Sequence, residues 1–519
     1  MLRTKLFEII KSNLFFFFFL VVIVFLLYGK SLNYDYTNHD DSSLIQDRNL
    51  LLSDVKNIPK LFTTSCFYSG NFQYYRPILT LSFAIETILF GENIFIYHLT
   101  NLFLFILSLW LMYVFLCKLN LNKVILQFLI ILVSVHPIVT SCAVWIPARN
   151  DTLLIIFLMS SFIFFIKYLN NKKNIFIVLS LFLFVLALFT KEITLVSIFI
   201  YIYLLFFFNV KLNKKNIILF ITIILLSICL FFYLKSISTI GLDLNHYIRN
   251  FKEYVVNIIV WTSIYIKQIL CPYNMPIMLY KTVFNSNYFA LFVICIILPL
   301  YLAFKNILDK KLIFFGFIFF FVFLLPTFFL YDCLLLFHRI FLPLVGFVII
   351  ICEVLDKFLT KFKILKKYFV YFFFCLIVIL FYKSSIQADK YINAYIYWDN
   401  AYKNAPNYHV ACLFKSYIEF ESGNFEKSEE LIKEAMKYDA KLYYANMAVL
   451  LFEQKKYKEA ESLFLESIKN NIDVATSYYY LSKIYLALSD IEKAKNFALV
   501  AYELNPYNKS VNKLKDQFN

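Results

Sequence analysis

The sequence is poor in glycine, in acidic residues and in paired cysteines. Its 519 residues include 7 Gly and 34 Asp or Glu, against 50 Lys or Arg, which gives a formal net charge of +16. The 10 Cys occur singly and never in CxxC spacing, so neither a disulfide framework nor a cysteine metal motif is present. In so acid-poor a chain, adjacent carboxylates at the end of an apolar segment are candidates for function.

Apolar residues dominate what is present. They make up 61% of the chain, with 63 Phe and 39 Tyr, whereas a soluble domain is typically just under half apolar. Apolar runs of about 16 to 20 residues alternate with short charged links, which predicts a multi-pass membrane protein. The Lys residues lie mainly at the ends of these runs and in the hydrophilic C-terminal part. We therefore expect them to orient the chain in a bilayer rather than to bind nucleic acid.

The apolar runs predict eleven spanning segments. The first is expected to be retained, because no small-residue cleavage site of a signal peptide follows it. The segments fall at 13–28, 98–117, 124–139, 151–169, 174–190, 193–209, 216–234, 287–304, 311–330, 340–355 and 367–383. Basic residues gather on alternate links: Arg3, Lys5, Lys11, Lys118, Lys123, Lys167, Lys172, Lys173, Lys211, Lys214, Lys215, Lys305, Lys310, Lys311, Lys357, Lys361, Lys363, Lys366 and Lys367. By the positive-inside rule these links are cytoplasmic.

Two further apolar stretches are not expected to span. A crossing by Val255 to Cys271 would reverse the side of every later link, so we expect an interfacial or re-entrant segment buried in protein. Pro77 to Gly91 is interrupted by Glu86 and is expected to lie as an amphipathic helix on the outer surface. The first loop, 30–97, the loop 235–286 and the C-terminal part are then extracytoplasmic.

The C-terminal part has the composition of a soluble helical domain and contains a repeat. Three segments align around Phe425, Tyr457 and Ile491. Small residues recur in step at Ser428, Ala460 and Ala494, and again at Ala435, Ser467 and Ala501. A period near 34 residues with small residues at helix crossings predicts tetratricopeptide repeats, which stack into an α-solenoid. The chain is thus expected to divide into a membrane domain, 1–385, and a domain of about three repeats and a terminal helix, 389–519. An irregular helical bundle is the alternative.

Short polar motifs recur on the expected outer side. They are Asp40-Asp41, Tyr74-Tyr75-Arg76-Pro77, Tyr97-His98, His136-Pro137, Arg149-Asn150-Asp151 and Thr190-Lys191-Glu192. Their order and spacing, together with the repeats, resemble the transmembrane and tetratricopeptide repeat-containing O-mannosyltransferases (the TMTC family) and their bacterial relatives in the GT-C glycosyltransferase superfamily.

This resemblance implies a fold and an activity. The fold is all-α, with a GT-C-type polytopic membrane domain of about eleven helices followed by the repeats. The activity is transfer of a sugar from a polyprenyl-phosphate donor on the lumenal or periplasmic face. His338-Arg339-Ile340-Phe341 departs from the Arg-Tyr pair usual in the family, and the loop 235–286 lacks recognisable motifs. Both departures leave the donor open.

The paired carboxylates suit one step of such a transfer. A base must take the proton of the acceptor hydroxyl, and one carboxylate suffices for an inverting displacement without a covalent intermediate. We expect Asp41 or Asp40 to be this base, with its neighbour orienting it or the acceptor. A solvated turn is the alternative, since Asp, Asn and Ser favour turns.

Fixed cations suit the leaving lipid phosphate, whose negative charge grows in the transition state. The donor-binding candidates are Arg149, Arg339, His338, Lys191 and Arg76. For each the alternative is an interfacial side chain whose charge reaches water, and Lys191 also has Glu192 beside it. His98, His136 and Glu192 are expected either to contact the acceptor or to be structural.

No metal or other cofactor is assigned. His39 with Asp40 and Asp41 could bind a divalent ion together with the lipid phosphate, but no second carboxylate cluster accompanies them. The expected partners are a polyprenyl-phosphate-linked sugar, membrane lipid and an acceptor protein held by the repeats at a Ser or Thr. The expected location is a bacterial inner membrane, or the endoplasmic reticulum membrane if the source is eukaryotic. A non-enzymatic membrane scaffold is the alternative function; a lipid-sugar transporter is disfavoured because no internal duplication is visible.

Overall fold

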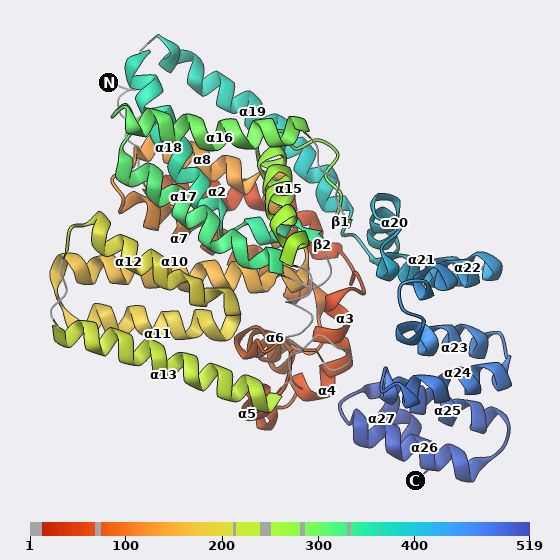
Figure 1. Ribbon diagram of the computed structural model, residues 1–519. Coiled ribbons are helices and arrows are strands. Elements are labelled where there is room, and N and C mark those ends of the chain that lie inside the picture. Colours follow the sequence, from red (N-terminus) through yellow and green to blue (C-terminus); the bar gives the residue numbers. More distant parts are fainter. Residues whose placement is uncertain are drawn as a thin grey trace.

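The computed structural model describes residues 13–67, 74–210, 214–238, 251–280, 286–329, 334–362 and 364–518. Parts of the predicted loop 235–286 and the basic residues Arg3, Lys5, Lys11, Lys211 and Lys363 lie outside these ranges. Within them the chain is mostly helical, with long helices on one side of the molecule and a tail of short helices on the other (Figure 1). One sheet of two short strands lies within this otherwise helical fold, which is consistent with the predicted all-α class.

Seven helical segments of the described chain are long and apolar enough to cross a membrane, or eight if a bent pair is one span. They lie in α2 (Asn13–Tyr28) with η1 (Gly29–Asn33), α7 (Ile94–Cys117), η5 (Ile146–Ala148) with α10 (Arg149–Asn171), α13 (Lys214–Ser238), α16 (Ser286–Phe304), α17 (Lys310–Leu324) with η7 (Leu325–Phe329), and α19 (Leu365–Asp389). The bent pair joins α8 (Lys123–Ser134) to η4 (Pro137–Val139) and α9 (Thr140–Val144) at 58°. The chain is therefore a multi-pass membrane protein.

The predicted count of eleven spans is not confirmed. Two of the remaining predicted spans, α11 (Asn174–Thr190) and η6 (Glu192–Ser197) with α12 (Ile198–Phe207), are shorter apolar helices. A third, α18 (Leu344–Lys361), carries several charged residues in its second half. The stretches predicted not to span form α15 (Phe251–Leu270) and α6 (Pro77–Phe90), and neither is among the seven. The side of each link stays a prediction.

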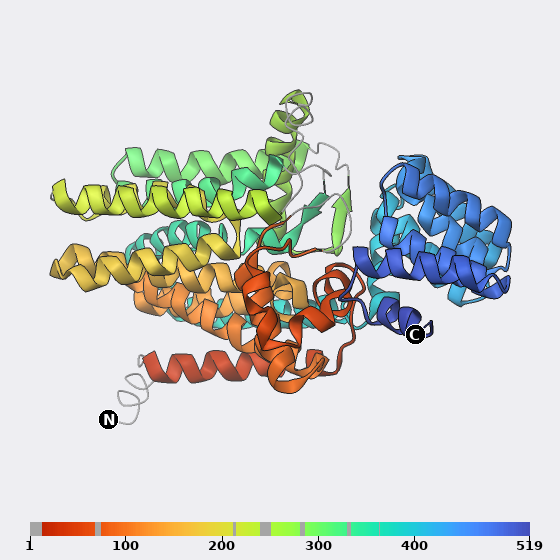
Figure 2. The same cartoon turned by 90° about the horizontal axis from the view of Figure 1, so that it is seen from below.

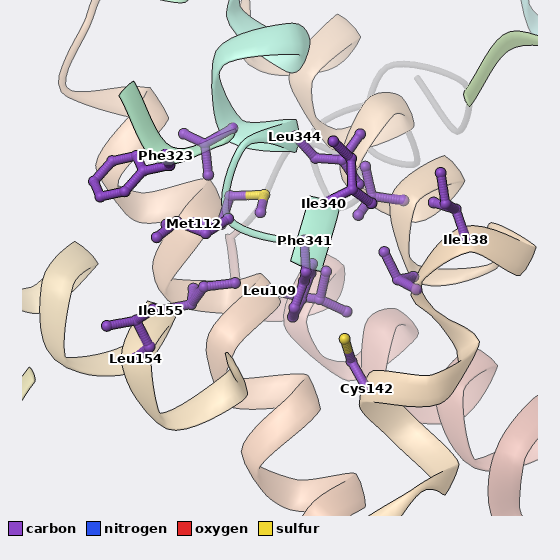
Figure 3. Packing of buried hydrophobic residues seen from close by; sticks show 14 of the residues in the cluster. Leu109, Met112, Ile138, Cys142, Leu154, Ile155, Phe323, Ile340, Phe341 and Leu344 are labelled. Carbon is purple, nitrogen blue, oxygen red and sulfur yellow. The ribbon is translucent and has the colours of Figure 1, made fainter. Parts of the chain in front are cut away.

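The long helices enclose one hydrophobic core. Figure 3 shows Leu109 and Met112 of α7, Ile155 of α10 and Phe323 of α17 around Phe341, which follows η8 (Phe337–Ile340). All of these side chains are buried. The core therefore packs directly against the segment that carries His338 and Arg339.

Helices α17 and α18 touch through glycine. A Cβ atom added to Gly316 of α17 would lie 2.8 Å from the carbonyl oxygen of Gly346, and one added to Gly346 would lie 2.6 Å from the amide nitrogen of Phe320. Both distances are too short for a side chain. The two backbones therefore lie closer than any other residue would allow, as small residues permit in membrane helices.

The first loop forms a cap of short helices at one end of the long ones. Its elements are α3 (Asp40–Leu44), η2 (Gln46–Arg48), α4 (Asn49–Leu52), η3 (Val55–Asn57), α5 (Ile58–Leu61) and α6. They share a separate hydrophobic cluster that includes Leu51, Leu61 and Phe83. Figure 2 shows this cap between the long helices and the tail.

The sheet pairs two distant segments. Strand β1 (Met278–Tyr280) runs antiparallel to β2 (Leu334–Leu336), with Met278 opposite Leu336. Because η8 follows β2 directly, the strand pairing fixes the position of the segment that carries His338 and Arg339.

The tail consists of nine short helices. They are α20 (Ala394–Asn404), α21 (His409–Glu421), α22 (Phe425–Met436), η9 (Ala440–Tyr443), α23 (Tyr444–Glu453), α24 (Tyr457–Lys469), α25 (Val474–Ala487), α26 (Ile491–Leu504) and α27 (Lys509–Asp516). Helix α21 packs on α22, α23 on α24 and α25 on α26. The six recurring small residues are all buried. This is what the predicted repeats require, while their tetratricopeptide identity stays a prediction.

The tail contacts the rest of the molecule at both ends. At its beginning, Asp389 accepts a hydrogen bond of 2.6 Å from Lys30, and Trp398 of α20 belongs to the main core. Near its end, Lys60 of α5 donates to the Tyr507 hydroxyl at 3.0 Å, and Lys509 lies 3.7 Å from Glu92. The tail is thus held against the first loop at two places.

Candidate functional site

The acid loop, residues 37–41, is closed by Asp41. The Asp41 carboxylate is buried and accepts hydrogen bonds from the Thr37 amide at 2.6 Å, the His39 amide at 2.9 Å and the Thr37 hydroxyl at 3.0 Å. Asn38 between them has a positive φ of 52°. Burial raises the pKa of Asp41, and the bonds from Thr37 oppose that rise. Both oxygens of Asp41 are therefore occupied in holding the turn.

Asp40 is placed differently. Its side chain is 39% exposed, and the basic side chain nearest to it in the described ion pairs is that of His39, whose Nε2 lies 3.8 Å from Oδ1. A base must reach the proton that it takes, and exposure allows this. The geometry therefore favours Asp40 as the base and Asp41 as the residue that holds the loop, a choice that the sequence left open.

Aromatic residues surround His39. Its ring stacks on Trp145 with centroids 5.5 Å apart, and its Nδ1 shares a hydrogen bond of 2.9 Å with the Tyr397 hydroxyl. The indole nitrogen of Trp145 donates to the Thr37 hydroxyl at 3.1 Å, and that of Trp398 donates to the Thr37 carbonyl at 3.0 Å. Two distant segments of the chain, one with Trp145 and one with Tyr397 and Trp398, thus fix the acid loop.

A second group of charges, here called the cation cluster, lies beside the acid loop. Its members are Arg76, Lys191, Lys235, His338 and Arg339 with the carboxylates Asp151 and Glu192. Lys191 lies 2.7 Å from Asp151, and His338 Nε2 lies 4.0 Å from the other oxygen of Asp151. Glu192 lies 3.8 Å from Arg76 and 3.7 Å from Lys235. The sequence had suggested Glu192 as the partner of Lys191, but Asp151 takes that place.

Polar atoms of the cluster are left without partners. Arg76 Nε and Asp151 Oδ2 are buried and have no hydrogen-bond partner among the described residues. Burial lowers the pKa of Lys191, and the Asp151 carboxylate opposes this. Burial also lowers the pKa of His338 well below its usual range, helped by Lys191 and Arg339. His338 is therefore a neutral imidazole, and Arg76 Nε remains able to donate a hydrogen bond to a negatively charged ligand.

The acid loop and the cation cluster adjoin each other. Trp145 lies between them, with ring centroids 5.5 Å from His39 and 5.4 Å from His338. Burial raises the pKa of Tyr74, and the carboxylates Glu192 and Asp40 also raise this pKa. The guanidinium groups of Arg76 and Arg339 lower it. All four charges thus act at the Tyr74 hydroxyl. Acid and cations share one site at the capped end of the helices.

Arg149 does not belong to this site. Its side chain is fully buried, with Nη1 at 2.7 Å from Glu86, Nε at 2.6 Å from Asn101 Oδ1 and Nη2 at 2.9 Å from the Tyr97 carbonyl oxygen. Its guanidinium also lies over the Phe83 ring. Every nitrogen is paired within the protein. The geometry therefore favours a structural role over the predicted donor binding, and it explains the Glu86 that interrupts α6.

Two histidines also take structural places. The His136 ring accepts from the Ile138 amide at 3.1 Å through Nδ1 and donates to the Ile269 carbonyl at 3.0 Å through Nε2, so it joins η4 to α15. His98 is buried in α7, with the edge of its ring facing Tyr34. Neither ring lies in the cation cluster, whereas Glu192 does.

A metal ion finds no ready site in the described part of the chain. No three His, Cys, Asp or Glu side chains there come together in a way that could hold one. His39 and Asp40 adjoin, but the oxygens of Asp41 are occupied within the loop. No step of the chemistry below is assigned to a metal.

Several residues of the site were not assigned from the sequence. Asp151 stands in a recognised motif, and a carboxylate at the start of an apolar run is itself a signal. Tyr74 likewise stands beside Arg76. Trp145, Tyr397 and Trp398 carry no local signal, because only the folded chain brings them to residues 37–39.

The fold and the site together define a helical membrane protein in which a partly exposed carboxylate lies beside a cluster of half-buried cations. Part of the chain is similar to the human Protein O-mannosyl-transferase TMTC1, with 28% identity over 183 residues, or 32% of this chain. The matched part covers 21% of the length of that relative. No protein-family profile matches the chain, and no solved structure matches it.

Proposed function

We propose that this protein is a GT-C-type glycosyltransferase that transfers a sugar from a polyprenyl-phosphate donor to a protein hydroxyl outside the cytoplasm. One observation carries the proposal: the partly exposed carboxylate of Asp40 lies beside half-buried cations, of which Arg76 has a buried Nε without a hydrogen-bond partner among the described residues. The similarity to an O-mannosyltransferase supports it and makes mannose the first sugar to test.

The site supplies both groups that the reaction needs. The acceptor oxygen attacks the anomeric carbon, and its proton passes to Asp40. The bond between that carbon and the phosphate oxygen breaks, and the phosphate leaves with the electron pair. Arg76, Lys191 and Arg339 hold its growing negative charge, because fixed cations act most strongly where water is excluded. A single displacement of this kind inverts the anomeric centre.

The tail is proposed to bring the acceptor to this site. It lies beside the first loop and touches it at Lys60 and Glu92. Repeat arrays bind extended peptides on their concave face, and a Ser or Thr in such a peptide would supply the hydroxyl. The proposed location is a bacterial inner membrane with the site on the extracytoplasmic side.

Replacement of Asp40 tests the proposal. Asp40→Asn should lower transfer from a synthetic polyprenyl-phosphate mannose to a Ser/Thr peptide by about a hundredfold or more, since a positioned base contributes at least that. The protein should still insert into the membrane. Asp54→Asn, an exposed carboxylate of the same loop, is the matched control and should keep wild-type transfer.

The outcome separates the enzyme from a scaffold. A scaffold would bind peptide without transferring sugar in any variant. Asp41→Asn should also lower transfer, but by disordering the loop. Normal transfer by both Asp40→Asn and Asp41→Asn would show that the catalytic assignment is wrong.

A further inference from the structure

Residues 385–392 lie along residues 30–35, the segment that leads into the acid loop. Lys30 donates to the Ser385 carbonyl at 2.9 Å, and the Tyr34 hydroxyl donates to Asp389 at 3.0 Å. The Asp35 amide then donates to the Ile392 carbonyl at 2.8 Å. These contacts run in parallel order along both segments. They end at residues 37–39, which receive Trp398 and Tyr397.

Two aromatic residues of α20, Tyr397 and Trp398, contact the acid loop just before Asp40 and Asp41. Trp398 donates to the Thr37 carbonyl at 3.0 Å, and the Thr37 amide in turn donates to Asp41. Tyr397 is hydrogen-bonded to His39 Nδ1, which leaves His39 Nε2 directed at Asp40. Both aromatic side chains are almost fully buried. They therefore fix two of the three residues that directly precede the acid pair.

A line of rings continues from the tail into the cation cluster. Phe414 of α21 stacks on Trp398 with centroids 4.0 Å apart, and Trp398 meets the His39 ring at 5.0 Å. His39 stacks on Trp145 at 5.5 Å, and Trp145 meets His338 at 5.4 Å. Each ring is held by its neighbours. A packed tail helix is thus in continuous contact with both parts of the site.

The same segment also holds the strand side of the site. Lys383 donates to the Pro272 carbonyl at 3.0 Å, and Lys390 donates to the Met275 carbonyl. These carbonyls precede β1, which pairs with β2 and so places His338 and Arg339. Residues 383–398 therefore contact the acid side and the cation side together.

We infer that Tyr397 and Trp398, two aromatic residues of α20, are positioning residues of the active site: Trp398 holds the acid loop closed, and Tyr397 fixes the imidazole of His39 toward Asp40. This inference rests on the proposed function. It makes the tail part of the catalytic site as well as the proposed carrier of the acceptor. Neither residue touches the reacting atoms.

The first test is independent of activity and uses the full-length protein in detergent. Trp398→Phe keeps the stack with Phe414 but removes the indole donor, so amide hydrogen exchange of the segment 34–45 should become about tenfold faster, as expected for a lost buried hydrogen bond. Tyr397→Phe removes only the hydroxyl, and modification of His39 by diethyl pyrocarbonate should become about fivefold faster. Tyr395→Phe, an exposed tyrosine of the same helix, is the control and should change neither rate.

The second test is kinetic. With polyprenyl-phosphate mannose and a Ser/Thr peptide, Tyr397→Phe should lower kcat by about tenfold while the KM for the donor stays unchanged, because the cation cluster is intact. A purely structural role would lower the amount of folded protein and leave kcat of the remainder unchanged.

The outcomes separate the two proposals. If the variants show faster exchange and faster His39 modification but the wild-type protein transfers no sugar, the proposed function is refuted and the positioning of the loop is supported. Wild-type exchange in Trp398→Phe together with wild-type His39 modification in Tyr397→Phe would overturn the inference, whatever the transfer rate.

Discussion

Two groups of charged side chains lie at the same end of this molecule and differ in how fully their polar atoms are paired. In the first, Arg149 is fully buried and each of its nitrogens has a protein partner, with Glu86 matching its charge. In the second, the half-buried cations Arg76, Lys191, Lys235 and Arg339 share the carboxylates Asp151 and Glu192 among the described residues, and Arg76 Nε and Asp151 Oδ2 have no hydrogen-bond partner there. Arg149 and Asp151 are two positions apart in the sequence. A balanced, fully paired group stabilises the fold, whereas an unbalanced one can accept an anion.

The largest expected effect separates the groups by stability. Arg149→Met should lower the free energy of unfolding by about 3 to 5 kcal/mol, because it leaves Glu86 buried without its partner. Denaturant titration of the purified protein measures this. The double variant Arg149→Met with Glu86→Gln should recover part of the loss. An unchanged stability in the single variant would contradict the structural role.

The second effect concerns ligand binding. Arg76→Gln should weaken binding of a synthetic polyprenyl phosphate by about tenfold to a hundredfold, the usual contribution of a charge-assisted hydrogen bond. Its stability should change by less than about 1 kcal/mol, since its ion pair is long and partly open to solvent. Fluorescence titration with the lipid checks the first value. Wild-type affinity would show that the cation cluster does not bind the phosphate.

The third effect depends on pH. The pKa of His338 lies well below its usual value in the folded protein, whereas in the unfolded chain it returns to about 6.5. Below that pH the unfolded chain binds a proton that the folded protein does not, so stability falls as the pH falls. At pH 5.5 the loss from this residue is about 1.4 kcal/mol. His338→Gln should remove it, as measured by unfolding at pH 8 and pH 5.5; an unaltered pH dependence would exclude a buried neutral imidazole.

The smallest effect is a gain. Glu192→Gln removes a partly exposed carboxylate from the cation cluster, so the lipid phosphate should bind up to about fivefold more tightly. The same titration measures it. Weaker binding would instead show that Glu192 is needed to hold Arg76 in place.

The sequence predicted the parts of the site that follow from charge and position. Asp40, Arg76, Lys191, Glu192, His338 and Arg339 do lie close together in the structure, as is expected of unusual polar residues in an apolar chain. The sequence did not decide which of Asp40 and Asp41 is the base, because the hydrogen bonds of Asp41 to Thr37 and His39 arise only when the turn has folded.

Arg149 shows the limit of a pattern based on charge alone. The same residue type in the same kind of link can be paired or unpaired, and its partner Glu86 lies 63 residues away. The role of α20 was hidden for a similar reason. Trp398 reaches Thr37 across 361 residues, a contact that only tertiary structure specifies.

Two of the seven glycines lie where α17 crosses α18. Four residues separate Arg339 from the start of α18. The position at which α18 packs against α17 therefore sets how far His338 and Arg339 extend over the site. A single methyl group at Gly316 or Gly346 would push the helices apart and carry Arg339 with them. A displacement of about 1 Å can cost a hundredfold in rate when a phosphate must be held in line. In a chain with so few glycines, the position of Arg339 over the substrate would then depend on the absence of a side chain at Gly316 and Gly346, which lie far from the substrate.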